Sequence, residues 1–186
     1  PSYAEVLTRL LSQEHTAQQE RFLEHRIRRA RLPERWSLGT FPWERQPGVE
    51  RRVIEQLATL EFIDRGSNIV FIGPTGVGKT GLATGLLLEA LFRRGLFMKA
   101  QDLFDEMYTT LADRSTRKFL NRLIRLDVIV IDEMGYLNLR PEQSNIFFKL
   151  MEERYRLQRS TLITTNLDFN EWFEFLGNKS MVSALL

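Results

Sequence analysis

The chain has 186 residues and a mass of 21.9 kDa, which is enough for one sizeable domain with a small appendage. It contains no cysteine and two histidines, which excludes disulfides and thiolate metal sites and argues against a histidine-rich metal site. Its apolar runs are shorter than the roughly 20 residues that span a membrane, and its polar start, with Glu5, is not that of a signal peptide. We therefore expect a cytoplasmic protein, and the net charge of +2 is too small to indicate a nucleic-acid partner by itself.

The first 35 residues are expected to form a helical N-terminal extension, and residues 36–186 the main domain. Ser2 and Glu5 fit a capping box, and helix-compatible sequence continues to about Leu32, just before Pro33. Between residues 21 and 35 there are six arginines and two glutamates, which leaves both DNA phosphates and a protein partner open as contacts of this helix. The candidate DNA-contacting residues here are Arg26, Arg28, Arg29 and Arg31.

Glycines and prolines between residues 37 and 48 predict an irregular connector, which carries Phe41 and Trp43. A helix is expected over residues 49–63. Beyond residue 68, strand-like and helix-like patterns alternate, which predicts an α/β fold with a parallel sheet covered by helices on both faces. The expected strands are 68–72, 96–100, 128–131 and 161–165, and the expected helices are 80–94, which Gly95 would close, 102–111, 114–126 and 142–156.

The segment Gly73-Pro74-Thr75-Gly76-Val77-Gly78-Lys79-Thr80 matches the phosphate-binding pattern G-x-x-x-x-G-K-[ST] in full. Glycines allow the backbone to turn its amides towards phosphates at the start of a helix, where the helix dipole also favours anions. Lys79 is expected to reach the β- and γ-phosphates, and the Thr80 hydroxyl to ligate Mg²⁺. A chance glycine turn is the alternative, but the β-rich run before the segment and the apolar helix after it favour a P-loop. The sequence thus predicts ATP and Mg²⁺ as cofactors, with Gly81 completing the nucleotide site.

Two further strand ends carry polar side chains. Asp132 and Glu133 follow the apolar run 128–131, as expected at the carboxyl end of a buried parallel strand, where such sheets place their ligands. Asp132 is predicted to hold Mg²⁺, mainly through water, and Glu133 to orient or deprotonate the attacking water. Asn166 follows the strand 161–165 and is predicted to contact the γ-phosphate. The alternatives are a solvated acidic turn and a turn-forming asparagine. The predicted catalytic residues are Lys79, Glu133 and Asn166.

The segment from Arg114 to Leu126 has five basic residues and no acidic one. At 100° per residue, four of these basic residues fall within about 80° of arc on a helix, with apolar residues opposite. Such a face suits phosphate contacts that are independent of base sequence and sensitive to salt, and a solvated surface face is the alternative. The candidate DNA-contacting residues are Arg114, Arg117, Lys118, Arg122 and Arg125.

These motifs resemble those of the AAA+ superfamily, and in particular its IstB/DnaC-like branch of transposition-helper and helicase-loader ATPases. The most specific residues are Asp132-Glu133-Met134-Gly135-Tyr136-Leu137, then Phe147 to Tyr155, then Thr164-Thr165-Asn166-Leu167, then Phe169-Asn170-Glu171-Trp172. The resemblance covers nearly the whole chain. It implies an AAA+ core in which the P-loop strand lies beside the strand before Asn166, with the strand before Asp132 next. It also implies that Asn166 is sensor 1, that Phe41 lies near the adenine, and that an arginine finger and a sensor 2 lid would follow Leu186.

The resemblance further implies an ATPase that converts ATP and water to ADP and phosphate and assists a transposase at target DNA. Its implied partners are double-stranded DNA, the transposase and other copies of the chain, in a homo-oligomer that depends on nucleotide. A replicative helicase loader would have the same chemistry and a different partner. Two other classes stay open: a nucleotide-gated DNA scaffold with little hydrolysis, and a small-molecule kinase, which would have an arginine-rich acceptor lid and no sensor asparagine.

Overall fold

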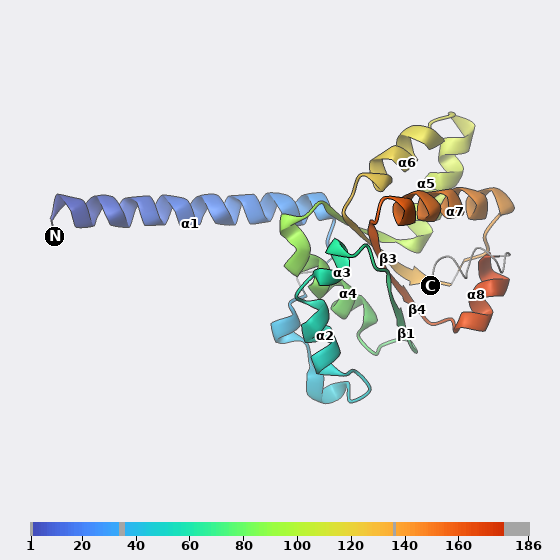
Figure 1. Ribbon diagram of the computed structural model, residues 1–186, viewed down its shortest axis with the longest axis horizontal. Helices are drawn as coiled ribbons and strands as arrows, with labels where there is room; N and C mark the ends of the chain where they lie inside the picture. The colour runs from blue at the N-terminus through green and yellow to red at the C-terminus, as the bar shows by residue number, and fades with distance from the viewer. Residues whose placement is uncertain (1, 34–35, 136, 177–186) are drawn as a thin grey trace.

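The computed structural model describes residues 2–33, 36–135 and 137–176 of the chain (Figure 1). Within these residues four parallel strands form one sheet in the order β1-β4-β3-β2. The strands are Ile69–Ile72 (β1), Gly95–Lys99 (β2), Val128–Met134 (β3) and Ser160–Thr165 (β4). The predicted parallel sheet is confirmed, and so is the predicted order, in which the P-loop strand β1 lies beside β4 and β3 comes next.

Helices cover both faces of the sheet, so the described part of the chain has three layers (Figure 1). On one face lie α3 (Glu61–Asp64) and α4 (Lys79–Glu89), with α2 (Arg51–Leu57) packed beside α4 through Ile54 and Leu82. On the other face lie α5 (Ala100–Ala112), α6 (Thr116–Ile124), α7 (Pro141–Arg156) and α8 (Phe169–Leu176). Short 3₁₀ turns occupy Leu38–Thr40 (η1), Trp43–Arg45 (η2) and Ala90–Phe92 (η3).

Strand β3 is buried on both faces because its apolar side chains alternate between the two helical layers. Val128 and Val130 pack towards α4, whereas Ile129 and Ile131 pack towards α5 and α7. A strand with helices on both sides needs such a continuous apolar run, since no position faces water until the strand ends. The first polar side chains on β3 are therefore at its carboxyl end, where Asp132 and Glu133 follow the run.

Helix α1 (Tyr3–Ala30) is a rod that projects away from the body of the molecule (Figure 1). Its predicted capping box is present, since Ser2 Oγ accepts from the Glu5 amide and the Glu5 carboxylate accepts from the Ser2 amide. The side chains of residues 5–16 are exposed, whereas Ala30 is buried against the body. In the described part of the chain, no helix combines the length and the apolar composition that crossing a membrane requires.

Three expectations about elements are wrong. The helix expected over residues 49–63 is broken into α2 and α3, because Leu60 adopts a left-handed conformation with φ of 66°. Gly95 is the first residue of β2 and caps no helix; a Cβ there would lie 2.6 Å from a Leu87 side-chain carbon, so glycine permits close packing of β2 on α4. Arg114 lies before α6, in a turn with φ of 58°, because the Ser115 amide bonds to Asp113 and Thr110.

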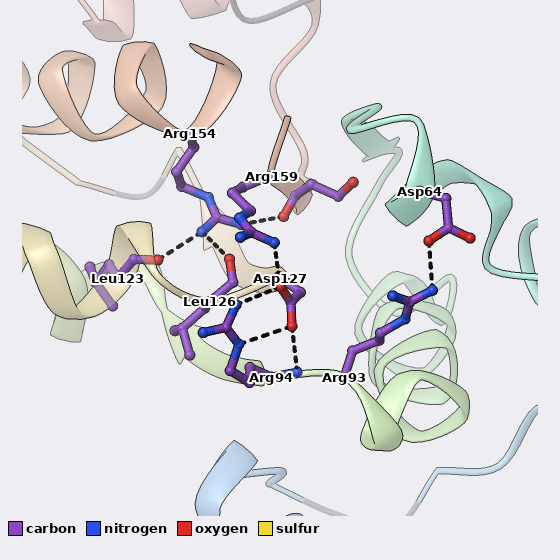
Figure 2. A network of polar contacts seen from close by, with 9 residues as sticks. Asp64, Arg93, Arg94, Leu123, Leu126, Asp127, Arg154 and Arg159 are labelled. Atoms are coloured by element: carbon purple, nitrogen blue, oxygen red, sulfur yellow. Dashed lines mark hydrogen bonds and ion pairs between the residues drawn. The ribbon is translucent and has the colours of Figure 1, made fainter. Parts of the chain in front are cut away.

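Charged side chains connect the amino ends of the strands, at the end of the sheet away from the P-loop (Figure 2). Arg154 of α7 is fully buried and donates to Thr161 Oγ1 and to the carbonyls of Leu123, Leu126 and Ser160. Burial lowers the pKa of Arg154 to about 9, so the guanidinium is still charged at neutral pH. An arginine suits this position, because its planar guanidinium has several N–H donors and can bond at the same time to oxygens of α6, of the residues that follow α6 and of β4.

Candidate functional site

The P-loop connects β1 to α4 and has the conformation that its glycines predict. Gly76 and Gly78 have φ angles of 86° and 85°, in the left-handed region that residues with a side chain rarely adopt. Gly78 is also crowded, since a Cβ there would lie 2.9 Å from two ring atoms of Phe41. Lys79 Nζ donates to the carbonyls of Gly73 and Pro74, at 2.7 and 2.8 Å, so the lysine lies over its own loop.

The carboxyl ends of β3 and β4 meet the P-loop around one cavity with a volume of about 640 Å³. This size lies within the range of about 300–1,000 Å³ that is usual for small-molecule and cofactor sites. The predicted residues that line the cavity are Phe41, Thr75, Gly76, Gly78, Lys79, Thr80, Gly81, Asp132, Glu133 and Asn166. The structure therefore brings the P-loop, the acid pair and Asn166 together, as expected where parallel strands end on the same side of a sheet.

The carboxylate of Asp132 is held by two hydroxyl groups from different elements. Thr80 Oγ1 donates to Asp132 Oδ1 at 2.8 Å, and Thr164 Oγ1 of β4 donates to the same oxygen at 2.6 Å. Asp132 is almost fully buried, and a buried carboxylate needs such donors to offset the loss of its water. The pair of Asp132 and Thr80 oxygens also fits Mg²⁺, which prefers hard oxygen ligands and keeps several waters and substrate oxygens. Among the described residues, no three acidic or histidine side chains come together as a metal site, so phosphate oxygens and water would have to complete the coordination.

Glu133 lies in an irregular part of β3. The register between β3 and β4 shifts between Ile131 and Met134. As a result, two residues of β3, Asp132 and Glu133, lie opposite a single residue of β4, Thr164. Glu133 has φ of 60°, a left-handed conformation that is strained for a residue with a side chain and costs about 1–3 kcal/mol. Its amide donates to Thr164 Oγ1 at 2.9 Å. Bulges of this kind turn a strand and re-aim side chains, and they often occur next to active sites.

Lys99 and Asn166 flank the acid pair. Lys99 ends β2, in register with Asp132, and its Nζ lies 3.4 Å from Glu133 Oε2. Asn166 follows β4, and its Oδ1 lies 3.3 Å from the position of a Cβ on Gly135, which follows β3 with φ of 119°. An amide and a carboxylate therefore line the cavity at the ends of adjacent strands.

Aromatic side chains from the connector form the wall of the cavity next to the P-loop. Phe41 is buried, packs edge-on against Trp43 with ring centroids 4.7 Å apart, and lies against Gly78 and Gly81. Trp36 lies over Gly81, where a Cβ would be 3.5 Å from its ring. The absence of side chains at these glycines lets apolar rings approach the phosphate loop, which suits the flat, apolar face of a nucleobase.

Some predicted site residues lie outside the cavity lining, and some lining residues were not predicted. Gly73, Pro74 and Val77 do not line the cavity; the Gly73 amide instead bonds to the Thr165 carbonyl. The lining residues that sequence reasoning missed are Pro33, Trp36, Pro42, Gln46, Phe97, Lys99, Thr164 and Thr165. The run of two threonines before Asn166 was the available signal, since polar side chains in an otherwise buried strand need partners.

The basic residues predicted to contact DNA lie on two separate elements. Arg117 and Lys118 are exposed on α6, with Arg114 before it and Arg125 at its C-terminal end. Arg122 is also exposed but pairs with Glu106 of α5 at 2.6 Å, so this face is not purely basic. Phe119 and Leu123 are buried on the opposite side of α6, as predicted.

The basic residues near the end of α1 differ in availability. Arg28, Arg29 and Arg31 are exposed. The guanidinium of Arg26 is instead bonded within the protein, since its Nη1 donates to the carbonyls of Leu91 and Arg93 at 2.8 and 3.2 Å. This arginine attaches α1 to the segment before β2, so its guanidinium is already engaged within the protein.

Proteins of similar sequence come from insertion sequences. The chain is 37% identical to the insertion sequence IS5376 ATP-binding protein of Geobacillus stearothermophilus, over all of this chain and 74% of that protein. It is 35% identical to the insertion sequence IS21 ATP-binding protein of Pseudomonas aeruginosa, over all of this chain and 70% of that protein.

Solved structures show the same fold. The DnaC helicase loader matches with a TM-score of 0.64 and 25% identity, over 81% of this chain and 91% of that one. AMPPCP-bound DnaA from Aquifex aeolicus matches with a TM-score of 0.69 and 18% identity, over 83% of this chain. The chain spans about half of that DnaA, 48% of its length, and this likeness concerns the fold alone. The α/β core is thus an AAA+ core similar to those of DnaA and DnaC.

The family described as IstB-like ATP binding protein matches residues 1–186, the whole of this sequence. The phosphate loop, the acid pair and the cavity between them provide the structural basis for that description. The chain therefore belongs to the family of IstB-like ATP-binding proteins.

Proposed function

We propose that this chain is a Mg²⁺-dependent ATPase that binds double-stranded DNA and assists a transposase at its target. The observation that supports this most directly is the cavity that Lys79, Thr80, Asp132, Glu133 and Asn166 share. A phosphate loop alone would support nucleotide binding. The acid pair and the amide at the ends of adjacent strands add the groups that hydrolysis needs.

In the bound state, the backbone amides of the P-loop and Lys79 hold the phosphates. The lysine exchanges its bonds to the loop carbonyls for phosphate oxygens, which are charged and therefore stronger acceptors. Thr80 and Asp132 would hold Mg²⁺, which neutralises phosphate charge when bound. Phe41 and Trp36 contact the base, because they line the cavity on the side of the connector.

Hydrolysis then depends on Glu133 and Asn166. The Glu133 carboxylate accepts a proton from the attacking water or orients it, and the Asn166 amide donates to the γ-phosphate. Lys99, whose Nζ lies 3.4 Å from Glu133 Oε2, adds a positive charge beside this carboxylate at the cavity edge. The kinase alternative would need an arginine-rich lid over the cavity. Among the described residues, the cavity lining contains no arginine, and its basic side chains are Lys79 and Lys99.

The transposase partner and the DNA are proposed from the relatives and from the surface of α6. The relatives from Geobacillus stearothermophilus and Pseudomonas aeruginosa are ATP-binding proteins of insertion sequences, which favours a transposition helper over a helicase loader. Exposed Arg117 and Lys118 provide charges for the DNA backbone. Nucleotide-dependent assembly of several copies on DNA, and a cytoplasmic location, belong to the same proposal.

The proposal is tested by measuring ATP turnover with and without duplex DNA and by imaging the same samples with ATP and with ADP. We expect turnover in the presence of Mg²⁺ and DNA-bound oligomers with ATP only. Binding of ATP without turnover under either condition would favour a nucleotide-gated scaffold. Recruitment of a replicative helicase, and not of a transposase, would favour the helicase loader.

Glu133→Gln should separate binding from hydrolysis. The amide has nearly the same shape as the carboxylate but cannot take a proton from water, so turnover should fall about 10²-fold or more. ATP affinity should stay within about threefold of the wild type, because the P-loop and Asp132 are unchanged. Normal turnover in this variant would show that Glu133 is only a residue of the bulge.

A further inference from the structure

The acid pair faces one cavity because β3 is bulged where it ends. In a regular strand, successive side chains point to opposite faces of the sheet, so Asp132 and Glu133 would diverge. Here two residues of β3 face the single residue Thr164, and both carboxylates line the cavity. The bulge therefore decides whether the predicted metal ligand and the predicted base can act on the same phosphate.

The hydroxyl of Thr164 takes the place of the ladder bond that the bulge disrupts. It accepts from the Glu133 amide at 2.9 Å and donates to Asp132 Oδ1 at 2.6 Å. One oxygen thus holds the left-handed backbone of Glu133 and the carboxylate of Asp132 together. Thr164 itself is 1% exposed, so water does not compete for these bonds.

We propose that Thr164 is a positioning residue for ATP hydrolysis, which acts by holding the bulge that points Asp132 and Glu133 into the cavity. This inference rests on the proposed ATPase function of the cavity. Thr164 need not touch the nucleotide, since its effect passes through the Glu133 amide and the Asp132 carboxylate. Its neighbour Thr165 has a different bonding pattern, since it donates to the Met134 carbonyl and accepts from the Leu167 amide.

The first test measures hydrogen exchange of the Glu133 amide by NMR in nucleotide-free protein. In the wild type this amide should exchange slowly, because it donates to a buried hydroxyl. In Thr164→Val, which keeps the branched shape and removes the hydroxyl, exchange should be faster by about tenfold or more. Thr164→Ser keeps the hydroxyl and should restore slow exchange. Unprotected exchange of the Glu133 amide in the wild type would overturn the proposal without any variant.

The second test measures turnover and substrate affinity in the same proteins. Thr164→Val should lower kcat by about 10²-fold, the effect of misplacing a catalytic group by about 1 Å. KM for ATP should stay within about threefold of the wild type, because the P-loop is intact. Thr164→Ser should keep kcat within about threefold of the wild type. Equal loss of kcat in the serine and valine variants would mean that the hydroxyl is not responsible, and would also overturn the proposal.

Thr161→Val is the matched control. Thr161 is fully buried on the same strand, and its hydroxyl accepts from Arg154 Nε at 3.1 Å, at the edge of the sheet away from the cavity. The control should lose stability yet keep the wild-type kcat and the slow exchange at Glu133. If the wild type shows no turnover with or without DNA, the proposed function is lost, but the exchange data still decide the role of Thr164. Wild-type exchange and kcat in Thr164→Val would reject that role.

Discussion

At the residue scale, Asp127 is the charged group that joins the starts of three strands. Arg94 precedes β2 and donates to Asp127 through its backbone amide and its guanidinium, and Arg159 precedes β4 and donates to the same carboxylate (Figure 2). Burial alone would raise the pKa of Asp127, but the hydrogen bonds and charge of Arg94, together with the charge of Arg159, lower it below its ordinary value. The ionised form therefore stabilises the folded state.

This interaction predicts a dependence of stability on pH. Because the folded-state pKa lies below the unfolded value of about 3.9, the stabilisation is complete above that pH and is lost as pH falls through the folded-state pKa. Asp127→Asn should lower the free energy of unfolding at pH 7 by about 1–2 kcal/mol, since charge-assisted bonds are lost. Urea unfolding of both proteins between pH 7 and pH 3 measures this, and the difference should shrink below about pH 4. A difference that is constant over this range would exclude the charge as its source.

At the element scale, α6 presents the proposed DNA-contacting residues on one side and packs against the body of the protein with the other. Phe119, Leu120 and Leu123 attach it to the body, and Arg117 and Lys118 face solvent. The pairing of Arg122 with Glu106 reduces the positive charge of this surface, which sequence periodicity along one helix does not show. Within α6 itself, we therefore expect Arg117 and Lys118 to contribute more to phosphate binding than Arg122, whose charge is partly neutralised by Glu106.

Changing Arg117 and Lys118 together to Gln should weaken binding to all DNA sequences about equally. Each charge that neutralises a phosphate releases condensed counterions, so the log–log salt dependence should flatten by roughly two units. Fluorescence anisotropy with duplexes of unrelated sequence at several salt concentrations measures both effects. ATP affinity should be unchanged, because these side chains lie away from the cavity.

The matched control for α6 is the change of Arg45 and Arg52 to Gln, which removes the same charge from exposed positions in η2 and α2. Helix α2 lies on the opposite side of the sheet (Figure 1). The control should leave the salt slope as in the wild type. If both double variants flatten the slope equally, net charge and not the α6 surface is responsible. Loss of assembly with an unchanged slope in the α6 variant would assign this face to a neighbouring subunit.

At the scale of the whole molecule, the cavity joins elements that lie far apart in the chain. The connector contributes Phe41, the P-loop contributes Lys79, and β3 and β4 contribute Asp132 and Thr164. A ligand that contacts all of them stabilises the folded state by mass action, by about 2.7 kcal/mol at a concentration of 100 times Kd. For a domain of this size each 1 kcal/mol raises Tm by roughly 2–4 °C.

ATP with Mg²⁺ should therefore raise Tm by roughly 5–10 °C at that concentration, and Lys79→Ala should remove most of this shift. Differential scanning fluorimetry measures both. Without nucleotide, the variant should be less stable by about 0.5–1 kcal/mol, because Lys79 bonds to two loop carbonyls and does not simply face solvent. Lys149→Ala, an exposed lysine of α7, is the control and should keep the full shift. A wild-type shift in Lys79→Ala would contradict phosphate binding by this lysine.

The sequence by itself determined the P-loop, the acid pair and the layers of the fold. These features are encoded by short contiguous segments: glycines at fixed spacing before Lys79, and an apolar run before Asp132. Local patterns of this kind predict strand, loop and helix because they act through backbone conformation and burial, which depend on near neighbours in the chain. The parallel order of the strands was available in addition from resemblance to a family.

The tertiary structure alone decided how these features act together. The sequence suggested Arg26 as a DNA-contacting residue. In the structure, its guanidinium donates to the carbonyls of Leu91 and Arg93, which lie 65 and 67 positions further along the chain. Thr164 looked like an ordinary strand residue, because its role depends on the register that lets two residues of β3 face it. The two threonines before Asn166 indicate that buried hydroxyls need partners, but they do not identify those partners, because register and long-range hydrogen bonds arise from the packing of distant segments.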